Sequence, residues 1–332
     1  MERTIALTGA TGFLGQAVVE RLLEEPSLKL RCLVREGRNP KGLDERGPRV
    51  EIVPGDVCAP KTLGPLLEGA WGVINLAGLR GFWARATKDY YDLNERGAAA
   101  VFRSAMDHDC EKVVQVSTPL AFGMPDRSPF DETDPPGPHA SDYARSKHLG
   151  DEAGWQLHQG AGLPFTVVHL AAVIGAGDPQ STMEVRRAAK GRLPALVGAD
   201  TTFTYVALRD AAEAIVQALL RPQTVGRCYL VGRERATTRE YFEIISELAK
   251  VPAPKWNIPE GWILPWARWG ERVARWTATT PWVPADVVST SAAGSLIFDA
   301  KKSEVELGLV YTPLREALSE AVAEIIGDRD KP

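Results

Sequence analysis

Short apolar runs alternate with amphipathic stretches through the first half of the chain. The apolar runs predict strands, and the stretches with apolar residues at every third or fourth position predict helices. Because strands that alternate with helices are joined by right-handed crossovers, the pattern predicts an α/β fold with a doubly wound parallel sheet. The expected strands are 4–8, 30–35, 50–57, 72–78, 112–118 and 165–175, and the expected helices are 16–25, 62–69, 90–108 and one that carries Tyr143.

The second half of the chain is less regular. Residues 205–222 predict a strand end that runs into a helix with Asp210 as its N-cap, 227–232 predict a strand, and 237–250 predict a helix. Beyond Val251 the chain is rich in proline and tryptophan, as expected for a lid built onto the first domain. We therefore expect two parts: a main domain of residues 1–172, to which 205–232 return, and a smaller mixed C-terminal lobe of 173–204 and 233–332.

Composition narrows the class of protein. The 332 residues carry 39 basic and 43 acidic side chains, well mixed, for a net charge of −4, which argues against nucleic-acid binding. The four cysteines and five histidines are dispersed, so neither a metal site nor a disulfide framework is indicated. The chain has no run of about eighteen apolar residues and does not begin like a signal peptide, so we expect a cytoplasmic protein.

A glycine-rich turn, TGATGFLG, joins the first expected strand to the first expected helix. Gly9 allows the tight turn, Gly12 lets the backbone approach a pyrophosphate, and Gly15 lets the helix pack close to the strand. The pyrophosphate would rest on the N-terminus of the helix, where free N–H groups favour an anion. The turn therefore predicts a Rossmann-type domain that binds a dinucleotide.

The end of the second expected strand indicates which dinucleotide it is. An NAD site carries Asp or Glu there, whereas this chain has Arg35, followed by Arg38 and Lys41. A guanidinium binds a 2′-phosphate in a fork, so NADP(H) is preferred over NAD(H), unless Arg35 is only a solvated loop residue. Asp56, after the third strand, is placed either to accept a hydrogen bond from the adenine amino group or to stabilise its own turn.

Tyr143 and Lys147 are four residues apart in SDYARSK, which places both side chains on one face of a helix. Such a pair alone is ordinary on a helix surface. A nearby ammonium, however, favours phenolate and lowers the pKa of a tyrosine from about 10 toward the working pH. A phenol tuned in this way can donate a proton to a carbonyl oxygen.

Together these motifs resemble the extended short-chain dehydrogenases/reductases of the NAD-dependent epimerase/dehydratase family. The glycine turn, the Tyr143–Lys147 pair and the strand ending in Ser117-Thr118 carry the resemblance, which covers nearly the whole chain. Asp56, NLAG (75–78), DLNERG (92–97), STPLAFG (117–123) and residues 298–318 agree in order. Within the family the chain is most similar to the dihydroflavonol-reductase and hydroxysteroid-dehydrogenase group, and residues 81–94 and 191–198 resemble bacterial hopanoid-associated reductase-like proteins.

The resemblance implies an active site. Tyr143 donates the proton, Lys147 tunes it and contacts the nicotinamide ribose, and Thr118, rather than Ser117, supplies a hydroxyl to the substrate oxygen. Asn94 either links Lys147 to solvent through water or only bends its helix. The implied cofactor-binding residues are Gly9, Thr11, Gly12, Phe13, Leu14, Gly15, Arg35, Asp56, Val57, Leu76, Ala77, Gly78, Tyr143, Lys147, Leu170, Ala172 and Val173.

Two further points follow from the resemblance. Many relatives carry Arg-Pro beside the nicotinamide where this chain has His169-Leu170, and we expect His169 to be packed rather than catalytic. Members of the family form homodimers through helices that correspond to 90–108 and 143–158, so a homodimer is expected.

The substrate is expected to be small and fairly apolar. Sugar-nucleotide epimerases place an arginine before the strand that resembles 202–208, where this chain has Phe203 and no basic residue between Gly198 and Leu208. An apolar residue cannot pair a buried phosphate. Trp83 and Phe122 are candidates for the substrate pocket, because their loops leave the sheet at its carboxyl edge.

Six of the nine tryptophans fall between Trp256 and Trp282. Trp262, Trp266, Trp269, Val273 and Trp276 are spaced as one stripe of a helix. Three interpretations stay open: a stripe packed in the core, an aromatic wall over an apolar pocket, or an interfacial helix that makes peripheral contact with a membrane.

The sequence thus predicts an NADP(H)-dependent oxidoreductase, a carbonyl reductase or alcohol dehydrogenase. It would transfer a hydride to or from a ketone, an aldehyde or the CH–OH group of a secondary alcohol. Two alternatives remain. One is a sugar-nucleotide epimerase or dehydratase without net redox, and the other is a catalytically silent regulatory protein that binds NADP(H).

Overall fold

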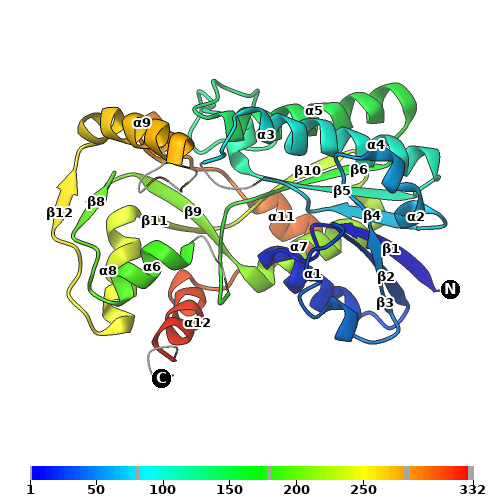
Figure 1. Cartoon of the computed structure of the whole chain (residues 1–332), viewed down its shortest axis with the longest axis horizontal. Helices are drawn as coiled ribbons and strands as arrows, with labels where there is room; N and C mark the ends of the chain where they lie inside the picture. Colours follow the sequence, from blue (N-terminus) through cyan, green and yellow to red (C-terminus); the bar gives the residue numbers. More distant parts are fainter. Residues whose placement is uncertain are drawn as a thin grey trace.

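The computed structural model of the protein describes residues 2–79, 83–177, 181–277, 279, 281 and 285–327. Of the residues singled out above, Gly81, Phe82 and Trp282 lie outside this set. The described chain forms a large parallel sheet covered by helices and a smaller lobe beside it (Figure 1).

Seven parallel strands form the large sheet, in the order β10-β6-β5-β4-β1-β2-β3. This confirms the predicted doubly wound sheet. The strand order reverses between β1 and β4, and in such sheets ligands bind at the carboxyl ends of the strands beside that point. The strands are β1 (Arg3–Thr8), β2 (Leu28–Val34), β3 (Val50–Pro54), β4 (Gly72–Asn75), β5 (Lys112–Ser117), β6 (Phe165–Leu170) and β10 (Arg227–Val231).

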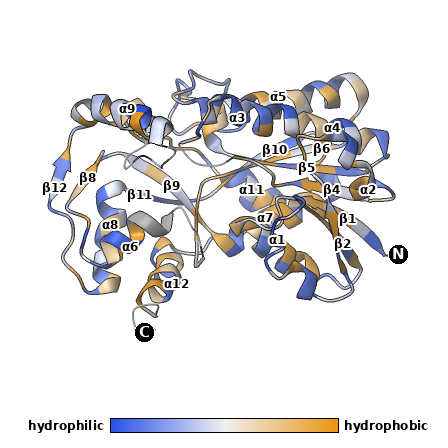
Figure 2. Ribbon diagram, viewed as in Figure 1, coloured by the Kyte–Doolittle hydropathy of each residue, from blue (hydrophilic) through white to orange (hydrophobic). Residues whose placement is uncertain are grey.

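Helices cover both faces of the large sheet (Figure 1). On one face α1 (Phe13–Leu23) and α7 (Leu208–Leu220) pack together, α1 over β2 and α7 over β4, β5 and β6, and Figure 2 shows apolar residues where they meet the strands. On the other face lie α4 (Ala98–Asp107) and α5 (Asp142–Ala161). Burial on both faces explains why strands such as β6 read as continuous apolar runs.

Shorter helices connect these elements. They are η1 (Leu43–Glu45), η2 (Pro60–Thr62), α2 (Gly64–Leu67), α3 (Lys88–Tyr90), η3 (Tyr91–Gly97), η4 (Pro119–Phe122), η5 (Pro222–Thr224) and α11 (Lys301–Leu307). The segment η3 is a π-helix, so the expected helix 90–108 is one continuous helical stretch with a widened turn at its start.

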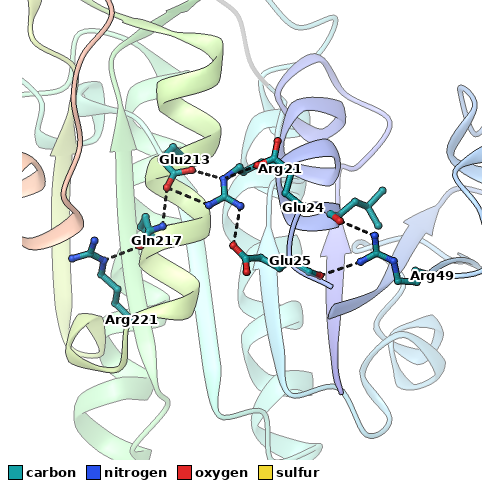
Figure 3. Close-up of polar contacts among 8 residues, drawn as sticks. Arg21, Glu24, Glu25, Arg49, Glu213, Gln217 and Arg221 are labelled. Atoms are coloured by element: carbon teal, nitrogen blue, oxygen red, sulfur yellow. Dashed lines mark hydrogen bonds and ion pairs between the residues drawn. The ribbon is translucent and has the colours of Figure 1, made fainter. Parts of the chain in front are cut away.

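A polar network joins α1 to α7 (Figure 3). Arg21 of α1 donates to both carboxylate oxygens of Glu213 on α7, and its Nη1 donates to Glu25 at 3.1 Å. Gln217 donates to Glu213 at 2.7 Å and accepts from Arg221 at 2.8 Å. Because 192 residues separate Arg21 from Glu213, the network fixes the later segment onto the first domain.

The smaller lobe contains a mixed sheet and a separate strand pair. β9 pairs antiparallel with β11 and parallel with β7, and β12 pairs with β8. Its elements are β7 (Ala172–Ile174), α6 (Ser181–Ala189), β8 (Ala195–Val197), β9 (Thr202–Ala207), β11 (Glu234–Thr237), α8 (Thr238–Ala249), β12 (Trp256–Ile258), α9 (Glu260–Thr277), α10 (Ala285–Ala293) and α12 (Leu314–Gly327).

Two sequence predictions need correction. The expected strand 165–175 is two strands, because the chain leaves the large sheet at Ala171 and β7 pairs with β9 in the lobe. Because the run has no Gly or Pro between Phe165 and Ile174, the sequence gives no sign of such a change. The N-cap of α7 is Ala207, not Asp210. The carboxylate of Asp210 instead accepts hydrogen bonds from the backbone N–H of Thr312 at 2.7 Å and from the Thr312 hydroxyl at 3.0 Å.

Within the described ranges, none of the helices combines the length and hydropathy that a bilayer crossing requires. No group of three or more His, Cys, Asp or Glu side chains in those ranges could hold a metal ion.

Candidate active site

The glycine turn sits where β1 meets α1 at the carboxyl edge of the sheet. Gly9 has a φ of 70°, and a Cβ there would lie 2.7 Å from the backbone carbon of Leu76. A Cβ at Gly15 would lie 2.3 Å from the carbonyl oxygen of Gly9. Both positions therefore need glycine, because backbone packs directly against backbone.

Gly12 differs from these two glycines. It is exposed, and a Cβ there would meet only the Gly9 carbonyl oxygen, at 3.1 Å. Its backbone leads directly into α1, whose first N–H groups have no partner within the helix. The turn thus has the open outer side and the helix N-terminus that a pyrophosphate requires. Thr11, Phe13 and Leu14 are half-buried around it.

The carboxyl end of β4 borders the same turn. The Thr8 hydroxyl accepts a hydrogen bond from the backbone N–H of Ala77 at 3.0 Å, which fixes this edge to β1. Leu76 and Ala77 are half-buried and Gly78 is exposed. A Cβ at Gly78 would lie 3.9 Å from the Lys147 Nζ, so the glycine turn, this edge and the lysine face one region. These residues fit a bound dinucleotide.

Arg35 and Asp56 lie at the far end of this region. Arg35 is exposed, directly after β2. Asp56 follows β3, and its Oδ1 accepts from the backbone N–H of Cys58 at 2.9 Å, so it stabilises its own turn. Val57 is buried, and a Cβ at Gly97 would lie 3.0 Å from it.

The helix α5 begins at Ser141, whose side chain accepts from the backbone N–H of Ala144 at 3.1 Å. Tyr143 lies half-buried in its first turn, with its ring centroid 6.1 Å from that of Tyr90. Lys147 is buried one turn later, and its Nζ donates to the Val116 carbonyl oxygen at 2.7 Å. Burial lowers the pKa of Lys147, and the carboxylate of Asp151 opposes that shift.

Asn94 is buried in the π-helix η3 and binds two elements at once. Its amide nitrogen donates to the Ser146 hydroxyl at 3.0 Å and to the Leu79 carbonyl at 3.1 Å, and its Oδ1 accepts from the Leu79 N–H at 2.8 Å. A Cβ at Gly150 would lie 2.1 Å from the Asn94 carbonyl oxygen, so η3 and α5 touch backbone to backbone. Asn94 thereby holds the loop after β4 against the helix that carries Lys147.

Ser117 and Thr118 end β5 with hydroxyls in different places. The Ser117 hydroxyl donates to Asp151 inside the protein. The Thr118 hydroxyl accepts from the backbone N–H of Leu120 at 3.4 Å, at the start of η4, which packs against α5. The Ser117 hydroxyl is therefore occupied by a structural contact, which leaves Thr118 as the better candidate for contact with a substrate.

Sequence reasoning missed Asp151, which lies buried one turn beyond Lys147. Burial raises the pKa of Asp151 to about 6, and the Lys147 charge and the Ser117 hydroxyl oppose that rise. Its Oδ2 lies 3.8 Å from the Nδ1 of His169, and its Oδ1 has no hydrogen-bond partner in the part of the chain that the structure describes. The signal was present, since Tyr143, Lys147 and Asp151 continue one spacing of four residues.

His169 is packed, as expected. It is buried, its ring lies 4.9 Å from that of Phe122, and its Nδ1 is 3.2 Å from the Thr118 carbonyl oxygen. Burial lowers the pKa of His169 to about 3, so the ring is neutral at neutral pH and can donate to that carbonyl. Phe122 is itself largely buried, against Phe130 as well as His169.

The other predicted residues lie at the same edge of the sheet or near it. Leu170 is buried at the end of β6, Ala172 is exposed and Val173 half-buried at the start of β7. Trp83 is half-buried, and its indole N–H is buried without a partner among the described residues.

The tryptophans of α9 are not a core stripe. Trp262, Trp266, Trp269 and Trp276 are 77%, 73%, 62% and 90% exposed. The opposite side of α9 is the buried one, where Ala267 and Ala274 pack against α10. Periodicity alone could not tell these two sides apart, because either could have faced the core.

Residues 5–232 match the model of the NAD dependent epimerase/dehydratase family. The chain belongs to this family. It is an extended short-chain dehydrogenase/reductase with the Rossmann-type sheet of that group, as its motifs predicted, and an enzyme of the oxidoreductase type. Members of the family bind NAD(H) or NADP(H).

Individual relatives agree with this assignment. The chain is 28% identical over 325 residues to a putative dihydroflavonol 4-reductase of Synechocystis sp., covering 95% of this chain and 92% of that protein. It is 28% identical over 328 residues to sterol demethylase protein B of Methylococcus capsulatus, covering 96% and 97%. The solved structure of gox2253 has a TM-score of 0.82 at 28% identity and covers 99% of each chain.

Proposed function

We propose that this protein is an NADP(H)-dependent carbonyl reductase or alcohol dehydrogenase that acts on a fairly apolar molecule. A bound nicotinamide supplies or accepts the hydride. The chain itself binds the dinucleotide at the glycine turn, orients the substrate oxygen and moves a proton at the Tyr143 phenol. The observation that carries the proposal is the buried Lys147, held on one face of α5 with Tyr143 and beside Gly78 at the edge of the sheet.

Proton transfer follows from the surroundings of Lys147. The ammonium has the Val116 carbonyl and the Asp151 carboxylate to stabilise its charge inside the protein. A cation one turn from a phenol favours the phenolate, which makes Tyr143 a better proton donor to a carbonyl oxygen and a better acceptor in the reverse direction. The Thr118 hydroxyl would hold the same oxygen.

The preference for NADP(H) rests on Arg35. Its guanidinium is exposed at the end of β2, with no carboxylate at the position that would bind a ribose hydroxyl. Arg38 and Lys41 in the next loop add positive charge, which a 2′-phosphate requires and an unmodified ribose does not.

The proposal that the substrate is apolar is supported by the residues of the smaller lobe. Phe203 is half-buried on β9 where an epimerase would present an arginine to a diphosphate, and β9 contributes to the lobe's apolar core. One relative is named for sterol demethylation, and another is named a ceramide reductase. Both names indicate apolar molecules, which fits a site without a basic clamp on β9.

The test is oxidation of NADPH followed by absorbance with a series of apolar ketones and aldehydes. Tyr143→Phe should lower kcat by a factor of about 10² to 10⁴, the usual contribution of general acid catalysis, while NADPH still binds. Tyr91→Phe is a matched control, since the Tyr91 hydroxyl only donates to Asp142 at 2.7 Å, and it should keep the activity. No NADPH oxidation with any carbonyl, together with a change in sugar stereochemistry, would replace the proposal by the epimerase alternative.

The cofactor preference is tested separately. Arg35→Ser should raise the Kd for NADPH about tenfold or more, because a charge-assisted hydrogen bond contributes about 1.5–3 kcal/mol. The Kd for NADH should stay nearly unchanged. Equal changes for the two dinucleotides would show that Arg35 does not select the 2′-phosphate.

A further inference from the structure

Large apolar side chains at the surface are concentrated in one segment. Nine are exposed in the described part of the chain, and seven of them lie on β12 and α9. We call the four tryptophans of α9, Trp262, Trp266, Trp269 and Trp276, the tryptophan face. Trp256 is 75% exposed, and the two exposed valines elsewhere, Val305 and Val310, lie in or near α11. Contiguous apolar surface of this kind marks a binding surface in a soluble protein.

The packing of α9 turns these tryptophans outward. Ala267 and Ala274 are buried against Ala285 and Val288 of α10, and the Glu271 carboxylate accepts from the backbone N–H of Ala285 at 2.8 Å. At 100° per residue these contacts lie on the side opposite to the four tryptophans of α9. The side chains that contact α10 are small and hold the helix close, so the large rings cannot turn inward.

The charge of this segment is opposite to that of the whole chain. Residues 252–277 contain four basic residues and two acidic ones, whereas the net charge of the protein is −4. Lys255, Arg268 and Arg272 are exposed, and on the helix the two arginines lie beside the tryptophan face rather than within it. Tryptophan on one face with Lys and Arg beside it is typical of helices that lie in the interface of a bilayer.

The helix that carries the tryptophan face lies close to the catalytic helix through its opposite, α10-facing side. The Tyr90 ring contacts the Tyr143 ring, and the carboxylates of Glu271 on α9 and Asp286 on α10 help burial to raise the pKa of Tyr90. These two helices therefore stand close to the start of α5. Binding of α9 to a bilayer would therefore place the candidate active site next to amphiphilic molecules dissolved in that bilayer.

We infer that the tryptophan face and its neighbouring basic residues bind the surface of an anionic lipid bilayer, with α9 lying in the plane of the interface. With 18 residues, α9 is about 27 Å long, so it can lie along the interface. The rings reach the headgroup level, and Lys255, Arg268 and Arg272 contact lipid phosphates. A second copy of the chain is the less suitable occupant, because two such faces would bring like charges together. This inference goes beyond the proposed reaction and does not depend on it.

The test is co-sedimentation of the full chain with phosphatidylcholine vesicles, with and without phosphatidylglycerol. Binding is expected to need the anionic lipid and to weaken as salt rises. Trp262→Ser and Trp269→Ser together should weaken partitioning at least tenfold, since burial of one large apolar side chain is worth about a factor of ten or more. Arg268→Gln and Arg272→Gln should each weaken it about fivefold.

Two controls make the result decisive. Val305→Ser with Val310→Ser removes exposed apolar residues elsewhere and should leave vesicle binding unchanged. Thermal unfolding and NADPH binding of each tryptophan variant should match the unmodified protein, because the rings are exposed. The inference is overturned if the full chain does not bind anionic vesicles, or if the tryptophan variants bind as well as the parent. It is also overturned if the tryptophan face only mediates self-association, seen as dimers that Trp262→Ser with Trp269→Ser abolishes.

Discussion

Two glycines in one turn should respond differently to the same substitution. In Gly15→Ala the new Cβ would lie 2.3 Å from the Gly9 carbonyl oxygen and 2.8 Å from the Cα and the carbonyl oxygen of Ala10. All three neighbours are backbone atoms, which cannot rotate away. Since ordinary contacts between heavy atoms are about 3.5–4.0 Å, α1 would have to move roughly 1 Å away from the turn at Gly9 and Ala10.

The cost of that movement can be estimated. Forcing one methyl group into a packed site costs about 1–3 kcal/mol, and α1 carries Val18, Val19 and Leu22 in the same core. With an unfolding entropy of about 2.1 cal/mol/K per residue, about 2 kcal/mol lowers the Tm of a protein of this size by roughly 3 °C. Gly15→Ala should therefore lose that much thermal stability, with NADPH affinity falling as a consequence of the displaced helix.

Gly12→Ala should show the opposite pattern. The backbone of Gly12 has a φ of −76°, which alanine adopts readily, and only one atom approaches its Cβ, at 3.1 Å. Stability should change by less than about 1 kcal/mol, the typical difference between alanine and better N-cap residues. The methyl group projects toward the proposed pyrophosphate position, so the Kd for NADPH should rise at least tenfold, about 1.4 kcal/mol.

Thermal unfolding and titration of NADPH measure both effects. Gly160→Ala in α5 is the control, because nothing lies within 4 Å of its Cβ, and it should be neutral or slightly stabilising. Gly15→Ala with an unchanged Tm would refute the close approach of α1 to the backbone of Gly9 and Ala10. Gly12→Ala with an unchanged Kd would refute the position of the pyrophosphate.

Two other predictions concern charged side chains. Burial raises the pKa of Asp151 from 3.8 to about 6, so the folded protein binds its proton more readily than the unfolded chain, and Asp151 destabilises the fold as pH rises from about 4 through 6. Asp151→Asn should remove up to about 3 kcal/mol of this loss in the free energy of unfolding. Chemical unfolding of both proteins at pH 4 and pH 7 should therefore show that the unmodified protein loses more stability between the two pH values. Equal losses in the two proteins would contradict the prediction. Arg21→Met should cost about 1 kcal/mol, because the pair with Glu213 is partly exposed, and a double-mutant cycle with Glu213→Gln should assign most of it to the pair.

The sheet and the cofactor turn were predictable because their signals are local. Strand, glycine turn and helix follow one another within 25 residues, and each glycine has its own steric reason. The placement of Tyr143 and Lys147 on one face of α5 was predictable because the helix fixes where residues four apart lie. The choice of Thr118 over Ser117 came from resemblance, and the contact of Ser117 with Asp151 now gives it a physical reason.

The features that the sequence did not predict depend on tertiary contacts. Asp151 looks like any polar residue of a helix until β5 and β6 cover it, and Asp210 looks like a cap until Thr312 binds it. The tryptophan face has the periodicity of a core stripe, and the two alanines that truly face α10 carry no clear signal. In each case the pattern gives the face of a helix but not what lies against that face.

The chain crosses between the main sheet and the lobe repeatedly, at Ala171, between Ala207 and Leu208, and after Val231. As a result neither part is a separable module: a fragment that stops at residue 172 would leave α1 without α7 and the edge of β6 without β10. Proteolysis at any one crossing would leave both parts attached through the other crossings. Rotation of the lobe is limited in the same way, because several backbone connections would have to bend at once.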